Sequence, residues 1–155
     1  MKEICPFCTG KVQHSAFAME AGFMAVLNHS PVLPGHLLII PLKHTDTLFS
    51  LSEEEIGRFF NFARTITRFI TREHDAQAFD WSLQEGEEAG QSVSHLHLHI
   101  IPRRINDLEG EEDWYVKLQA GKALDDAQRP IMDSSQYEYL TGILKKKWAD
   151  YQGKS

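Results

Sequence analysis

The chain has few of the features that would build a secreted or membrane protein. Its 155 residues include only two cysteines, Cys5 and Cys8, which is too few for a disulfide framework. The first residues form no apolar signal region, and no apolar run approaches the roughly 18 residues that a membrane span needs. We therefore expect a cytoplasmic protein that does not bind or cross a membrane.

Positive charge is scarce as well. Sixteen Lys and Arg against 22 Asp and Glu give a formal net charge of -6, whereas a protein that tracks a nucleic-acid backbone needs a basic stripe. This balance argues against nucleic acid as a partner but allows a small anionic ligand held by local donors. At this length we expect a single domain over 1–155 with a core of its own.

Short apolar segments bounded by turn residues predict four strands, over 23–27, 36–41, 79–84 and 93–101. The Pro34-Gly35 turn joins the first two strands into a hairpin, and the last two are expected to pair. Strand pairs combined with long helices are typical of an α+β fold.

Helical spacing of apolar residues predicts a long helix over 52–74, begun by a capping box, and a last helix over 133–151. A long amphipathic helix needs a sheet to cover, so its aromatic stripe is expected to be core. The acidic stretch 105–132 is expected to be a mobile connection with a short helix over 113–119.

The most informative stretch is His95-Leu96-His97-Leu98-His99, three imidazoles spaced two residues apart and followed by apolar residues. In a strand this period of two places all three rings on one face, with the leucines packed behind them. Neutral imidazole nitrogens can act as nucleophile, base or metal ligand. A half-exposed strand whose polar residues happen to be histidine is the alternative.

The loop 84–92 between the last two predicted strands contains two glycines, and backbone amides in such a loop can bind an anion. We expect the carboxylates of this loop to point outward and its neutral side chains to act as donors. The carboxylates are Glu85, Glu87 and Glu88, and the donors are Gln84, Gln91 and Ser92.

The Cys5-Pro6-Phe7-Cys8 segment has three interpretations: a redox pair, half of a zinc site, or two inert reduced thiols. A redox pair normally lies between a strand and a helix, and only four residues precede Cys5. A tetrahedral zinc site needs two more ligands, which His44 and His95 can supply.

These motifs resemble those of the histidine triad (HIT) superfamily, which is defined by His-x-His-x-His followed by apolar residues. The segment from Asn28 to Pro41 is similar to the family's nucleoside-binding hairpin. Residues 84–103 resemble the fragile-histidine-triad branch of dinucleoside polyphosphate hydrolases, which carry Gln where the nucleoside phosphoramidases carry Asn. The resemblance covers about residues 4–104, and beyond them Trp114-Tyr115 and the last helix also fit that branch.

The resemblance implies an enzyme that cleaves at the α-phosphate of a nucleotide through a covalent nucleotidyl-histidine intermediate. By position, His97 would be the nucleophile, His99 would donate to the phosphate, and His36 would orient a triad ring. The implied nucleotide-binding and phosphate-binding residues are Asn28, Gln84, Gln91, Ser92 and His99. No catalytic metal or organic cofactor is implied.

Several members of the family bind structural zinc through ligands that match Cys5, Cys8, His44 and His95, although the best-known fragile-histidine-triad members lack the cysteine pair. The resemblance also implies a HIT-like fold: an antiparallel sheet with one long helix packed on it and a C-terminal helix, the sheet extending across a homodimer.

Three other functions remain open at this point. One is a nucleoside phosphoramidase of the same superfamily, and another is a nucleotide-binding adaptor or sensor whose catalysis is incidental. The third is a transferase resembling the hexose-1-phosphate uridylyltransferases, which is disfavoured because those carry proline between two motif histidines where this chain has Leu96.

Overall fold

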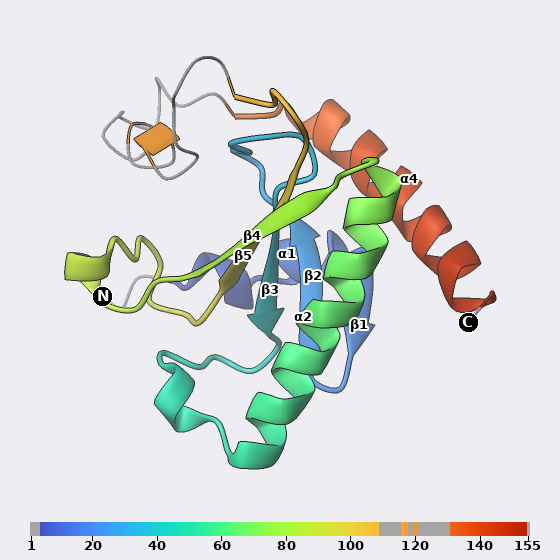
Figure 1. The fold of residues 1–155 in the computed structure, drawn as a ribbon. Coiled ribbons are helices and arrows are strands. Elements are labelled where there is room, and N and C mark those ends of the chain that lie inside the picture. The colour runs from blue at the N-terminus through green and yellow to red at the C-terminus, as the bar shows by residue number, and fades with distance from the viewer. Residues whose placement is uncertain (1–3, 109–115, 118–119, 121–130, 155) are drawn as a thin grey trace.

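The computed structural model describes residues 4–108, 116–117, 120 and 131–154. Figure 1 shows the order of the elements along the chain. They are η1 (Pro6–Cys8), α1 (Gly10–His14), β1 (Ala18–Glu20), β2 (Phe23–Leu27), β3 (Leu37–Pro41), η2 (Leu48–Ser50), α2 (Glu53–Glu73), β4 (Ala78–Leu83), η3 (Glu87–Ala89), β5 (Leu98–Arg103) and α4 (Ser134–Gln152).

The strands form one antiparallel sheet in the order β1-β2-β3-β5-β4. The predicted hairpin of β2 and β3 and the predicted pair of β4 and β5 are both present, and β3 joins them by pairing with β5. His99 lies in the middle of the sheet, opposite Leu38 on β3 and Ser82 on β4. The α+β fold class expected from the sequence is confirmed.

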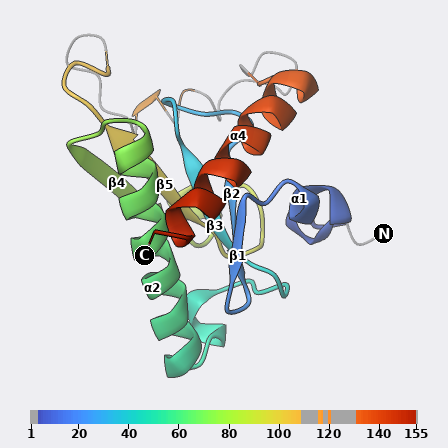
Figure 2. The ribbon, with the colours of Figure 1, turned by 90° about the vertical axis from the view of Figure 1, so that its right-hand side faces the viewer.

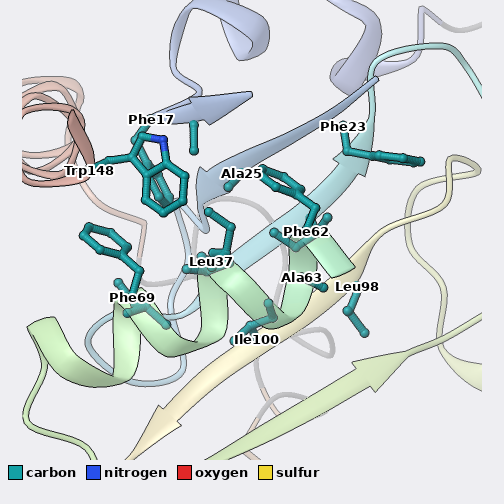
Figure 3. Packing of buried hydrophobic residues seen from close by; sticks show 14 of the residues in the cluster. Phe17, Phe23, Ala25, Leu37, Phe62, Ala63, Phe69, Leu98, Ile100 and Trp148 are labelled. Atoms are coloured by element: carbon teal, nitrogen blue, oxygen red, sulfur yellow. The ribbon is translucent and has the colours of Figure 1, made fainter. Parts of the chain in front are cut away.

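The long helix α2 is fixed at its start by the predicted capping box. Ser52 accepts from the backbone N–H of Glu55, and the Glu55 carboxylate accepts from the backbone N–H of Ser52. Its apolar stripe packs on the sheet, and α4 adds Leu144 and Trp148 to the same core. Figure 3 shows this packing around the labelled residues Phe69, Leu37 and Trp148. The aromatic stripe is core, as the sequence predicts.

The two faces of the sheet are covered differently, because successive strand residues point to opposite sides. Ala25 and Leu27 belong to the core under α2, whereas Met24 and Val26 belong to a smaller apolar cluster against which Phe7 packs. Figure 2 shows α1 and α2 on opposite sides of the sheet. The N-terminal elements therefore cover the face that α2 leaves open.

The predicted strand over 93–101 is wrong at its start, since β5 begins only at Leu98. The backbone N–H of His95 donates to the Val93 carbonyl at 2.8 Å, and that of Leu96 donates to the Thr45 carbonyl at 2.6 Å. The chain therefore turns before it joins the sheet.

Two short N-terminal elements, α1 and β1, were not predicted from the sequence, because five and three residues are too few to show a period.

Most of the expected connection over 105–132, including most of its helix over 113–119, lies outside the described residues. Within the part of the chain that the structure describes, no helix is both long and apolar enough to cross a membrane.

His36, the residue before β3, is a polar group buried at 0% exposure. The backbone N–H of Val32 donates to its Nδ1 at 3.1 Å, so this nitrogen carries no proton. Burial, together with a smaller repulsion from His97, lowers the pKa of His36 from 6.5 to about 3. His36 is therefore neutral at any pH at which the protein would work.

This lowered pKa predicts a specific loss of stability in acid. The unfolded chain, in which the histidine has a pKa near 6.5, binds the proton more tightly than the folded chain, so stability falls as the pH drops from 6.5 towards 3. Between pH 7 and pH 5 the wild type should lose about 2 kcal/mol more unfolding free energy in urea titrations than His36→Gln loses. The exposed His14→Gln variant should behave as the wild type. Equal pH slopes for the wild type and His36→Gln would contradict this account.

Candidate active site

The triad histidines lie at the point where the chain enters β5, and all three are buried. The rings of His97 and His99 are neighbours, with centroids 5.0 Å apart and planes at 64°. Leu98 and Ile100 point to the opposite side and pack under α2. The predicted arrangement, with imidazoles on one side and aliphatics behind, thus holds for His97 and His99.

The proton of His97 is placed by one hydrogen bond. Its Nδ1 lies 2.7 Å from the backbone carbonyl of His95, and a carbonyl oxygen can only accept. Nδ1 must therefore carry the N–H. In the neutral ring Nε2 is then the unprotonated nitrogen, and an unprotonated imidazole nitrogen is what a nucleophile needs.

The proton of His99 is placed by its neighbour His36. Because Nδ1 of His36 accepts from Val32, the proton of the neutral His36 ring sits on Nε2, which donates to Nδ1 of His99 at 2.9 Å. His99 then carries its own proton on Nε2. His97 and His99 thus present a lone pair and a donor from adjacent rings.

Asn28 lies beside this chain of rings at the end of β2. Its Oδ1 accepts from the backbone N–H of Ser30 at 2.9 Å, and its amide nitrogen is 3.3 Å from Nε2 of His36. A backbone bond from Asn28 to the His36 carbonyl, 2.9 Å long, holds the two residues together. The structure therefore brings the predicted ribose contact next to the predicted orienting histidine.

The loop 84–92 folds around two glycines in the left-handed region. Gly86 and Gly90 have φ of 85° and 90°, values that favour glycine strongly. Oε1 of Gln91 accepts from the backbone N–H of Gly86 at 2.8 Å, and the Gln91 Nε2 is buried without a protein partner. A buried amide donor that lacks a partner is costly unless a ligand or water accepts from it.

The other predicted members of this loop differ in exposure. Gln84 is buried, whereas Ser92, Glu87 and Glu88 are exposed. The expectation that Glu85 points outward is wrong. Its carboxylate accepts from the Thr47 hydroxyl at 2.8 Å and from the backbone N–H of Leu48, so it ties this loop to η2.

Cys5, Cys8, His44 and His95 come together in a second cluster, with their ligand atoms all within 4.8 Å of one another. The Cys5 sulfur lies 3.4 Å from Nδ1 of His95, and the Cys8 sulfur lies 3.3 Å from Nδ1 of His44. Sulfur and nitrogen ligands of one tetrahedral zinc ion lie about 3.5 Å apart, given bonds of about 2.3 and 2.05 Å. The four side chains fit such an ion.

Nε2 of each imidazole in this cluster has a hydrogen-bond partner. Nε2 of His95 donates to the Pro41 carbonyl at 3.0 Å, and Nε2 of His44 pairs with Asp46 at 2.8 Å. Both Nδ1 atoms therefore turn their lone pairs to the sulfurs, as metal-bound histidines do when a second group holds the other nitrogen. Burial lowers the pKa of His95, which keeps it neutral.

Sequence reasoning missed the supporting residues of both clusters. Asp46 is two residues from His44, and Thr47 is the residue that meets Glu85. Phe7 packs edge-on against His95 and His97. The position of Phe7 between the two cysteines could have indicated that its ring lies near the cluster. No sequence pattern pairs Thr47 with Glu85.

Three comparisons bear on this geometry. The bis(5'-adenosyl)-triphosphatase of Saccharomyces cerevisiae is 44% identical over 86 residues, which cover 54% of this chain and 42% of that protein. The crystal structure of Plasmodium falciparum diadenosine triphosphate hydrolase in complex with cyclomarin A has a TM-score of 0.71 at 26% identity, covering 89% of this chain and 78% of that one. A zinc-bound histidine triad family protein from Mycobacterium smegmatis has a TM-score of 0.69 at 24% identity, covering 97% of each chain, and shows the fold alone.

This chain thus spans about two fifths of the length of the yeast relative. The family itself is identified by a match over most of the chain, since residues 10–106 fit the sequence model of the HIT domain. That range contains His36, the loop 84–92 and the whole triad. The chain belongs to the HIT domain family.

Proposed function

We propose that this protein hydrolyses dinucleoside polyphosphates, or transfers nucleotides from them, through a covalent nucleotidyl intermediate on His97. The observation that carries the proposal is the 2.7 Å hydrogen bond from Nδ1 of His97 to the His95 carbonyl, which places the proton of the neutral ring on Nδ1 and makes Nε2 the unprotonated nitrogen that can attack. The name of the yeast relative, bis(5'-adenosyl)-triphosphatase, supports this substrate class.

In the first step Nε2 of His97 attacks the α-phosphorus in line with the bridging oxygen of the leaving group. A phosphorus–nitrogen bond forms, and the phosphorus–oxygen bond breaks with its electron pair going to the departing nucleotide. In the second step water attacks the same phosphorus, the nucleoside monophosphate leaves with the oxygen, and the electron pair returns to Nε2. Neither step changes an oxidation state.

The neighbouring groups suit the charge that develops on the phosphate. The N–H at Nε2 of His99 and the partnerless amide of Gln91 can donate to the phosphate oxygens, with Gln84 and Ser92 at the same loop. Asn28 keeps a lone pair on Oδ1 for a ribose hydroxyl. Val26 and Leu38 belong to the apolar cluster on the sheet face of His99, where a base would lie.

His97→Asn tests the nucleophile. Because Asn cannot form the intermediate, turnover of diadenosine triphosphate and tetraphosphate should fall by at least about a thousandfold while nucleotide binding by calorimetry survives. A phosphorus–nitrogen adduct trapped by acid-free quenching should be present in the wild type and absent from the variant. The matched control is His14→Asn, at an exposed site.

Turnover measured on diadenosine triphosphate, diadenosine tetraphosphate and adenosine phosphoramidate separates this proposal from its alternatives. Faster cleavage of the phosphoramidate than of the polyphosphates would favour a phosphoramidase. Near-background turnover of every compound, together with tight binding, would instead indicate an adaptor or sensor and would overturn the hydrolase proposal.

We also propose that Cys5, Cys8, His44 and His95 hold a structural zinc ion. Two thiolates and two neutral imidazoles at these separations make a closed tetrahedral site with no position open for a substrate. Thiolate ligands need a reducing compartment such as the cytoplasm. The zinc-bound protein from Mycobacterium smegmatis is consistent with this assignment, which rests on the four ligands.

Elemental analysis of the purified protein should find one zinc per chain. Cys8→Ser should retain at least about tenfold less zinc, because serine is a poor zinc ligand. It should also unfold at a lower temperature, because zinc binding contributes to folding. Thr9→Ser, next in the chain, should keep its zinc. Wild-type protein that holds no stoichiometric metal after purification without chelator would refute the assignment.

We propose further that two copies pair through β4, which forms one edge of the sheet and exposes Phe79. The other edge, β1, has only three residues. An exposed edge strand offers unpaired backbone groups to a second chain, and a two-fold pair would satisfy them.

Analytical ultracentrifugation should therefore find a species of twice 17.7 kDa. Phe79→Glu should raise the dissociation constant at least about tenfold, because it places like charges across the two-fold axis. Phe49→Glu, at a site 91% exposed, should leave it unchanged. A wild type that sediments as a monomer at micromolar concentration would contradict the pairing.

A further inference from the structure

Phe7 lies between the metal cluster and the triad. Its ring meets His97 edge-on, with centroids 5.3 Å apart and planes at 70°, and meets His95 in the same way at 5.7 Å and 73°. The His97 ring also contacts the ring of His99, with centroids 5.0 Å apart. Two aromatic contacts therefore limit how far the His97 ring can turn.

The segment that carries Phe7 has little else to fix it. It belongs to η1, a single turn of three residues with no side-chain cap and no buried residue. Backbone bonds from Cys8 to Cys5 and from Thr9 to Pro6 close the turn, at 3.1 and 3.4 Å. Phe7 packs against the apolar cluster of the sheet, and the two cysteines that flank it face His44 and His95.

Two connections thus run from the metal cluster to the nucleophile. One is the hydrogen bond from His97 to the carbonyl of the ligand His95, and the other is the Phe7 ring held between the ligands Cys5 and Cys8. The first places the His97 proton on Nδ1, and the second limits how the His97 ring can turn. Small errors in the direction of a nucleophile cost large factors in rate.

We propose that Phe7 is a positioning residue for His97, and that a metal held by Cys5 and Cys8 sets the Phe7 ring in place. This inference rests on the proposed function, because it concerns the same nucleophile. The metal cluster, although closed to substrate, would then contribute to the rate of nucleotide transfer by fixing the orientation of the His97 imidazole.

Phe7→Leu is the direct test, with Phe7→Tyr as the conservative variant. Leucine removes the aromatic edge and should lower the single-turnover rate of His97 nucleotidylation by at least about tenfold, with KM changed less than about threefold and zinc content unchanged. Tyrosine keeps the ring and should restore most of the rate. Phe49→Leu, at the exposed site, should have no effect.

Nuclear magnetic resonance of the ring protons supplies a readout that needs no turnover. Loss of the Phe7 ring current should shift the His97 ring signals in Phe7→Leu, and removal of metal with a chelator should shift the same signals while those of His14 stay in place. The His97 signals are identified by their absence from His97→Asn.

Two results would overturn the proposal. One is a chelated protein whose His97 signals and single-turnover rate match those of the metal-loaded protein. The other is Phe7→Leu acting on KM alone, which would make Phe7 only a wall of the nucleotide pocket. A wild type that turns over no nucleotide defeats the proposed function, whereas the ring signals still decide the positioning of His97.

Discussion

The chemistry proposed for this protein depends on the hydrogen bond between Nδ1 of His97 and the carbonyl of His95. A neutral imidazole has one N–H, so donating it to a backbone carbonyl two residues away leaves the other nitrogen unprotonated. The N–H of Val32 donates to Nδ1 of His36, so the His36 proton lies on Nε2 and is donated to Nδ1 of His99. His99 therefore carries its own proton on Nε2. Burial keeps His36 neutral. Adjacent rings consequently present an unprotonated nitrogen on His97 and an N–H donor on His99.

The sheet fixes His99, whereas the segment with His95 and His97 depends on contacts outside the sheet. His99 lies in the middle of the sheet between β3 and β4, over a core covered by α2 and α4. His95 and His97 lie before β5 begins, where the sheet no longer holds the backbone. The hydrogen bond from Leu96 to Thr45 and the cluster of cysteines and histidines hold that segment. A metal at that cluster would stabilise the part of the triad that the sheet does not reach.

The sequence predicted the regular parts of this architecture because their residues repeat. The apolar runs of β2 and β3, bounded by turn residues, and the 21-residue stripe of α2, with its Ser52 and Glu55 capping box, were sufficient to place them. The motif spacing also selected the four cluster residues, and the resemblance to the histidine triad superfamily indicated His36 as a partner of the triad. Sequence patterns failed where contacts between distant residues determine the local structure. The turn at His95 depends on Thr45, and the orientation of Glu85 depends on Thr47 and Leu48, which no local pattern reports.

Nitrogen-15 spectroscopy of the imidazole rings at neutral pH tests the placement of these protons most directly. The account predicts that His97 carries its proton on Nδ1 with an unprotonated Nε2, and that His36 and His99 each carry theirs on Nε2. A His97 ring protonated on Nε2, or on both nitrogens, would leave no lone pair facing a substrate and would contradict the account.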